Sequence, residues 1–142
     1  LCTHYVLLSL LLLLLLFYTT ILHASEATIL EKVESSARSW LELVDAGKFK
    51  QSWENASPLF KAKTSESQWL KFIDPIRTPR GGITARYIAT AASADSWSDY
   101  PDGEYVVLQF YTTFVKKGLA METVILAKNQ DGAWQFLEYS IK

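Results

Sequence analysis

The spacing of hydrophobic residues in the first half of the chain predicts helices. Over residues 29–44, apolar positions recur every three or four residues and charged residues occupy the other face, which indicates an amphipathic helix. Gly47 follows, and glycine suits the left-handed residue that often ends a helix. We expect a short second helix over residues 48–56. A third should begin at the capping box of residues 65–68 and end or kink at Asp74-Pro75.

In the second half, the hydrophobic period changes to two, which predicts β-strands. The alternation covers residues 84–92, 104–115, 119–128 and 133–141. Lys117-Gly118 and Asp131-Gly132 have the composition of compact hairpin turns, so consecutive strands should pair antiparallel as a meander. The predicted fold is therefore α+β, with N-terminal helices packed on one face of a four-stranded antiparallel sheet.

The turn at Lys117-Gly118 also predicts which side chains share a face of the sheet. If Lys116 pairs with Leu119, then Glu122 lies opposite Thr113. The face expected beneath the helices is rich in aromatic residues and nearly free of charge. The outer face of the sheet would then carry Tyr105, Val107, Gln109, Tyr111, Thr113, Glu122, Val124, Leu137 and Tyr139.

The first 24 residues differ in kind from the rest of the chain. Val6 to Phe17 forms an apolar run of about a dozen residues, which fits the central region of a secretory signal peptide. Ala24 and Ala27 are the candidates for the last residue removed. Two interpretations stay open: a cleaved signal peptide, which we favour, and an uncleaved membrane anchor over residues 5–22. We expect a periplasmic or secreted protein, with residues 28–142 as a single α+β domain that meets a membrane only if the leader is retained.

Composition removes several classes of chemistry from this domain. Cys2, His4 and His23 all lie in the leader, so the domain itself contains neither cysteine nor histidine. That excludes thiol nucleophiles, Cys/His zinc sites, histidine acid–base catalysis and disulfides. The net charge of −1 gives no bulk attraction to nucleic acid. We therefore expect no metal, no cofactor and no nucleic-acid partner.

Glu122 is the main candidate for chemistry, and it has two interpretations. A carboxylate between Thr113 and a tyrosine on a sheet face is able to accept a proton or hold a ligand hydroxyl. Alternatively, Glu122 forms an ordinary cross-strand pair facing solvent, with Arg86 as its ion partner, which stabilises the sheet only slightly. Because the expected register puts Glu122 on the more polar face, we favour the structural role.

Several motifs resemble one bacterial family, domain-of-unknown-function family 4019. They are Gln109-Phe-x-Thr-x-Phe114 and Glu122-Thr-Val124 in adjacent strands, followed by Asp131-Gly-x-Trp134. The similarity extends from about residue 28 to the end of the chain. It implies an NTF2-like or cystatin-like α+β roll and export to the cell envelope, and it assigns no activity.

These observations favour a non-catalytic binding or interaction module. The expected outer face is too apolar to be simply solvated, so it should form a homodimer or contact another envelope protein. Trp97 stands in a Ser/Asp-rich loop, where an aromatic side chain is a candidate partner contact. The alternative is a small-molecule pocket, or an enzyme with a Glu/Tyr site, between sheet and helices. The candidate ligand or interface residues are Gln109, Tyr111, Thr113, Glu122, Tyr139, Arg86 and Trp97.

Overall fold

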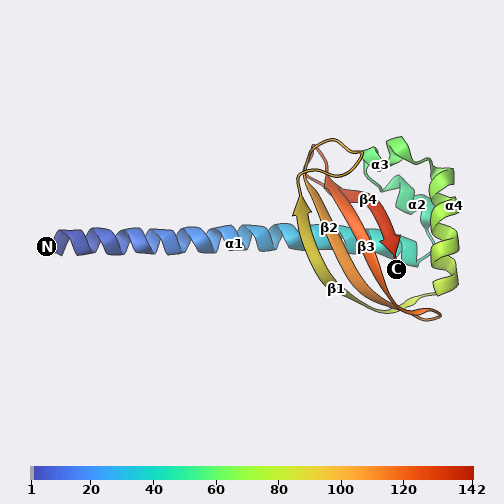
Figure 1. Ribbon diagram of the computed structural model, residues 1–142, viewed down its shortest axis with the longest axis horizontal. Helices are drawn as coiled ribbons and strands as arrows, with labels where there is room; N and C mark the ends of the chain where they lie inside the picture. The colour runs from blue at the N-terminus through green and yellow to red at the C-terminus, as the bar shows by residue number, and fades with distance from the viewer. Residues whose placement is uncertain (1) are drawn as a thin grey trace. The chain divides into compact units, whose positions relative to one another are not determined.

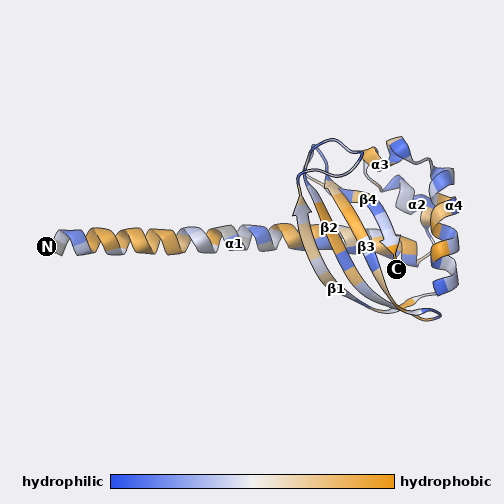
Figure 2. Cartoon of the chain, in the orientation of Figure 1, coloured by the Kyte–Doolittle hydropathy of each residue, from blue (hydrophilic) through white to orange (hydrophobic). Residues whose placement is uncertain are grey.

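The computed structural model describes residues 2–142, apart from the side chains of Cys2, Leu22, Ala24 and Ala27. The expected cleavage positions, Ala24 and Ala27, therefore fall outside the described side chains. The chain divides into two compact units, Leu1–Lys32 and Val33–Lys142. In the first unit, Thr3–Ile21 is helical and long and apolar enough to cross a membrane, a property that signal peptides share (Figure 2).

The second unit contains the end of α1 (Cys2–Asp45) and three further α-helices: α2 (Phe49–Glu54), α3 (Pro58–Lys63) and α4 (Glu66–Arg77). Figure 1 shows these helices together with the sheet. Gly47 ends the first helical segment with φ +70°, as expected. The Ser57 side chain accepts a hydrogen bond from the Leu59 amide at 3.2 Å, so Ser57-Pro58 starts a helix of its own.

Helix α4 begins as predicted but does not end where expected. Ser65 and Gln68 form the reciprocal hydrogen bonds of a capping box. The helix then continues through Pro75 to Arg77, followed by a short 3₁₀ helix, η1 (Thr78–Arg80), so the end expected at Asp74-Pro75 is wrong. A proline this late costs one backbone hydrogen bond, and the buried side chains of Ile73 and Arg77 hold the last turn.

Four strands form one antiparallel sheet in the order β1-β2-β3-β4, which confirms the predicted meander. The observed bounds lie within two residues of the expected ones. They are β1 (Ile83–Ala94), β2 (Tyr105–Phe114), β3 (Gly118–Lys128) and β4 (Trp134–Ile141).

The expected register between β2 and β3 is wrong. Phe114 pairs with Gly118, so the loop contains three residues, 115–117, and Gly118 takes φ +73°. Glu122 therefore lies opposite Phe110, not Thr113. A shift of three residues moves every side chain of β3 to the opposite face, because side chains alternate with a period of two. Glu122, Val124 and, on β4, Tyr139 consequently lie on the helix-covered face and are buried.

An aromatic cluster fills the space between helices and sheet. The Trp40 ring of α1 stacks on Phe136 of β4, with centroids 3.8 Å apart. Trp69 of α4 packs against both, and its indole N–H donates to the Ser52 hydroxyl at 2.9 Å. Trp40 donates to the Ser52 carbonyl at 3.0 Å, so the polar atoms of both indoles are satisfied inside the core.

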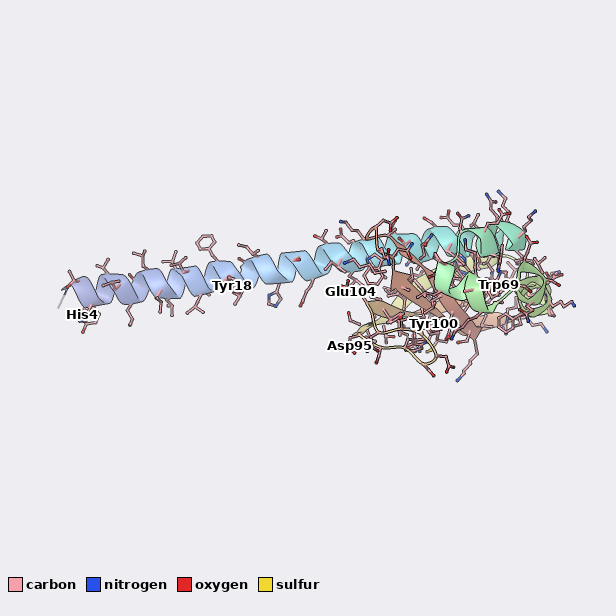
Figure 3. The ribbon with its side chains drawn as sticks, turned by 90° about the horizontal axis from the view of Figure 1, so that it is seen from above. His4, Tyr18, Trp69, Asp95, Tyr100 and Glu104 are labelled. Atoms are coloured by element: carbon pink, nitrogen blue, oxygen red, sulfur yellow. The ribbon has the colours of Figure 1, made fainter. Side chains whose placement is uncertain are left out.

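The connection between β1 and β2 folds back onto the domain. The Gly103 amide donates to the Asp95 carbonyl at 3.0 Å, and the Tyr105 hydroxyl donates to the Pro101 carbonyl. Figure 3 labels Asp95, Tyr100 and Glu104 along this segment and Trp69 on α4. Trp97 and Tyr100 are half-buried against the core, so Trp97 is less available than its loop position suggests.

Candidate functional site

Four ionisable side chains meet at the helix-covered face of the sheet: Asp45, Arg77, Arg86 and Glu122. Asp45 is the last residue of α1 and Arg77 the last of α4. Arg86 lies in β1 opposite Thr112 and so projects onto the same face as Thr112. The hairpin register brings Glu122 of β3 to this face as well.

Each arginine of this charged cluster contacts both carboxylates. Arg86 Nη1 donates to Asp45 Oδ2 at 2.7 Å, and its Nε donates to Glu122 Oε1 at 2.9 Å. Arg77 Nη2 donates to Asp45 Oδ1 at 2.5 Å, and its Nη1 donates to Glu122 Oε2 at 3.4 Å. Two positive and two negative charges therefore balance within one closed set of ion pairs.

Neutral groups complete the surroundings of Glu122. The Thr112 hydroxyl donates to Glu122 Oε1 at 2.5 Å, and the Tyr139 hydroxyl donates to Oε2 at 2.5 Å. Each carboxylate oxygen thus accepts from one arginine and one hydroxyl. The Glu122 side chain is 0% exposed and lines none of the described cavities. A substrate would have to displace one of these donors to reach it.

Burial and charge act together on the titration of this cluster. Burial alone would raise the pKa of the Asp45 carboxyl, but hydrogen bonds and charge from Arg86 and Arg77 outweigh burial and hold that pKa below its usual range. Burial raises the pKa of the Tyr139 phenol, and the nearby charge of Glu122 raises it further. Tyr139 is therefore neutral at physiological pH and acts as a hydrogen-bond donor.

Only the Asp45 edge of the cluster approaches the surface. The Asp45 side chain is 17% exposed, whereas those of Arg77 and Arg86 are 3% and 5% exposed. A shallow hollow of about 260 Å³ opens there, lined by Asp45, Arg77 and Gly81 among others. The Asp45 carboxylate in this hollow is already paired with both arginines, so the hollow offers no free base. Arg77 Nε is buried without a hydrogen-bond partner.

The structure brings together three of the residues expected from the sequence and separates the others from them. Glu122 and Arg86 belong to the charged cluster, and the Tyr139 hydroxyl donates to Glu122. Gln109, Tyr111 and Thr113 alternate with Thr112 along β2, so their side chains lie on the outer face of the sheet, opposite the helix-covered face. Gln109 accepts a hydrogen bond from Thr90 at 2.7 Å, and Tyr111 is 47% exposed. Trp97 packs in the connection before β2, apart from both groups.

Sequence reasoning missed Arg77, and a signal for it exists. Trp69, Ile73 and Arg77 follow one another at intervals of four along α4, and all three are buried. That spacing places Arg77 on the buried stripe of the helix. A buried arginine needs an acidic partner, so this position pointed to a carboxylate inside the fold.

Comparison with known proteins identifies a family and a fold. A family model described as "Protein of unknown function (DUF4019)" matches residues 36–139. No curated protein matches the chain. A solved structure of a protein from Catenulispora acidiphila has a TM-score of 0.52 and 14% identity, covering 83% of this chain and 93% of that one.

Two further structures are more distant. A Catenulispora acidiphila structure in complex with S-DNPA has a TM-score of 0.49 and 15% identity, over 81% of this chain and 92% of the other. ActVI-ORFA from Streptomyces coelicolor has a TM-score of 0.49 and 10% identity, over 81% and 96%. At these identities the likeness concerns the fold alone, and the first structure supports the expected NTF2-like α+β roll.

Proposed function

This chain belongs to the DUF4019 family of proteins of unknown function, and from its uncharged sheet surface we propose that it is an exported, non-catalytic module that binds a second copy of itself. The apolar helical segment Thr3–Ile21 supports export, as a signal peptide or as an anchor. The sheet surface supports self-association, and the closed surroundings of Glu122 argue against catalysis there.

The outer sheet face carries no charge across three strands. Tyr87, which is 70% exposed, pairs with Tyr111, and Tyr111 pairs with Met121, so an aromatic and apolar row crosses β1 to β3. A solvated sheet face normally carries charged and strongly polar side chains at alternate positions. The outer-face positions that are exposed or half-exposed are Ala85, Tyr87, Thr90, Ala92 and Ala94 in β1, Val107, Gln109, Tyr111 and Thr113 in β2, and Leu119, Met121 and Thr123 in β3. Tyr105, Ile125 and Ala127 have the same parity but are buried, so they are not part of this surface.

Strand β1 is a long edge strand without the usual protection. It is 12 residues long, and its exposed part, residues 87–93, contains no charged residue and no proline. Among the described residues, no hydrogen bond from outside β1 and β2 reaches its backbone. Natural edge strands are normally blocked by lysine, proline or a covering segment, and an unblocked edge pairs readily with another strand.

A second copy is the partner that this edge fits best. Two β1 strands related by a two-fold axis pair antiparallel, so the same surface serves both subunits. The absence of charge means that no like charges face one another across the axis. The two outer faces then continue into one extended uncharged surface.

Catalysis at Glu122, the alternative function, requires an accessible carboxylate. Glu122 accepts four hydrogen bonds or ion pairs and is fully buried. The largest described cavity, of about 620 Å³, is lined instead by Pro58, Tyr105, Lys128 and neighbouring loop residues. A small-molecule ligand would use that cavity, and none of the residues that line it belongs to the charged cluster.

Light scattering of the full chain, isolated in mild detergent, tests the dimer. We expect a dimer at micromolar concentration that Tyr87→Lys converts to monomer, because the substitution puts a charge on the uncharged edge of each copy. Val115→Lys is the matched control, since Val115 is 64% exposed and lies in the β2–β3 loop. A monomeric wild type, or a dimer that Tyr87→Lys leaves intact, would refute the proposal.

Export has its own test. Mass spectrometry of the protein recovered from the envelope fraction should find a chain that begins after Ala24 or Ala27, or an intact chain in the membrane. An intact chain in the soluble cytosolic fraction would contradict export.

A further inference from the structure

A groove separates helix α4 from the free edge of strand β4. Two adjoining hollows of about 400 and 520 Å³ make up this groove, which we call the α4–β4 groove. Phe72 of α4 lines both hollows and is 45% exposed. Tyr139 lines the first hollow, and Ser140 and Ile141 line the second. The groove therefore runs along the last residues of β4.

The backbone of β4 presents hydrogen-bonding groups to this groove. Lys142 and Met121 exchange both backbone hydrogen bonds, at 2.8 and 3.0 Å. Bonded and non-bonded pairs alternate in an antiparallel ladder, so the N–H and C=O groups of Ile141 and Tyr139 point away from β3. Farther along, the Phe136 carbonyl accepts a hydrogen bond from the Ser57 amide at 2.8 Å. In the described chain, no backbone hydrogen bond reaches Tyr139 or Ile141 from the α4 side.

The second hollow combines an apolar floor with positive charge. Ile76 and Pro79 line it together with Arg80 and Lys117, and no acidic residue does. Neither Arg80 nor Lys117 forms an ion pair among the described residues. Arg80 Nε is buried without a hydrogen-bond partner. Arg80 also lies over the Phe114 ring, 5.5 Å from its centroid. A carboxylate placed here would meet two cations that no acidic side chain among the described residues neutralises.

We propose that the α4–β4 groove binds an extended peptide, which adds to β4 as a fifth strand and places a carboxylate beside Arg80 and Lys117. Backbone groups that point outward at alternate residues match the pairing pattern of an added strand. The apolar floor accepts the side chains that face it, and the two cations select a carboxylate at one end. That carboxylate is either the peptide's C-terminus or an acidic side chain.

This partner differs from the one proposed for β1. The exposed part of β1, residues 87–93, carries no carboxylate, so the β1 edge of a second copy would leave both cations of the groove unmatched. The two surfaces lie on opposite edges of the sheet, because β1 and β4 are its outer strands.

Fluorescence anisotropy with labelled synthetic peptides tests the groove, using the full chain in mild detergent. The probes are octapeptides of alternating valine and threonine with a free C-terminus, prepared as a set in which one central residue is valine, leucine, phenylalanine or tyrosine. We expect saturable binding by at least one member. C-terminal amidation should weaken that peptide about tenfold. A C-terminal aspartate in the amidated peptide should restore binding if a side-chain carboxylate serves equally. N-methylation of alternate amides should abolish binding, because it removes the strand pairing.

Two protein variants locate the site. Lys117→Glu should weaken binding about tenfold or more, since it replaces attraction by repulsion. Ile141→Pro removes an outward N–H and leaves the hydrogen bonds to β3 intact, so it should weaken binding without unfolding the sheet. Lys71→Glu is the control, because Lys71 is exposed on α4 and lines neither hollow.

Three peptide-binding results would overturn the proposal. They are no saturable binding by any peptide of the set, binding that survives N-methylation, and binding that is equal in wild type, Lys117→Glu and Ile141→Pro. If light scattering finds an oligomer that Ile141→Pro dissolves, the occupant is a second copy and the peptide proposal is wrong. The three peptide-binding results leave the dimer test at Tyr87 unaffected.

Discussion

Replacing Glu122 by glutamine isolates the electrostatic contribution of the charged cluster. The substitution preserves the shape of the side chain and removes one of two negative charges, which leaves Arg77 and Arg86 to share Asp45. Each oxygen of Glu122 accepts from one arginine and one hydroxyl. The glutamine side chain replaces one of these oxygens by an NH₂ group, which cannot accept a hydrogen bond. In either orientation of the amide, one arginine and one hydroxyl therefore lose their acceptor.

The expected loss is large because the group is fully buried. Removing one partner from a buried ion pair typically costs about 3–5 kcal/mol. Asp45 still neutralises part of the positive charge, so we expect the free energy of unfolding to fall by about 3 kcal/mol, the lower end of that range. Small domains unfold with about 5–15 kcal/mol, so the variant should be clearly weakened and still able to fold.

Urea unfolding followed by tryptophan fluorescence measures this loss, since Trp40 and Trp69 report on the aromatic cluster beside Tyr139. Glu104→Gln is the matched control. The pair between Glu104 and Lys128 spans 3.1 Å, but the two side chains are 68% and 35% exposed. Its loss should cost less than about 1 kcal/mol. If Glu122→Gln costs no more than the control, the cluster does not stabilise the fold as argued.

Three further substitutions follow from the same contacts. The pKa of Asp45 is held below its usual value, so its carboxylate stabilises the fold above about pH 4 and loses that effect as the pH falls through the folded pKa. Asp45→Asn should therefore flatten the acid side of the stability–pH curve measured by urea unfolding. An unchanged curve would contradict this. The pKa of Tyr139 is raised above its ordinary 10.0, so its contribution is complete below that pH and declines above it. Tyr139→Phe should remove this alkaline decline, which ultraviolet titration of tyrosinate can follow, and persistence of the decline would assign it to other groups. Ser65→Ala removes the capping box of α4 and should lower the free energy of unfolding in urea by about 1 kcal/mol. The control is Ser98→Ala in the exposed β1–β2 connection. Equal losses in the two variants would show that the cap does not stabilise the fold.

The sequence predicted the elements well because their hydrophobic period is a local property. Alternation located all four strands to within two residues, and the spacing of three and four located the amphipathic end of α1. The capping residues Ser65 and Gln68 also act locally, so the start of α4 was predictable. Elements whose ends depend on neighbours were not, as the continuation of α4 through Pro75 illustrates.

The faces of the sheet were harder to predict because they depend on the length of one loop. Both faces of β3 are apolar, with Leu119 and Met121 on one and Val124 and Leu126 on the other, so hydrophobicity alone does not choose between them. The hairpin was expected to turn at Lys117-Gly118, and its three-residue loop reversed the assignment of Glu122. An arginine in β1 and another on the buried stripe of α4 were the residues that required a buried carboxylate.

The closed set of four charges also constrains how this sequence can change over generations. Losing any one of Asp45, Arg77, Arg86 or Glu122 leaves an unmatched charge in the interior, so every single-step route out of the cluster passes through a less stable chain. Replacing all four together by apolar residues of similar volume avoids that intermediate. These positions are therefore coupled in their effects on fitness, and we expect relatives to keep the whole set or to lack it as a block.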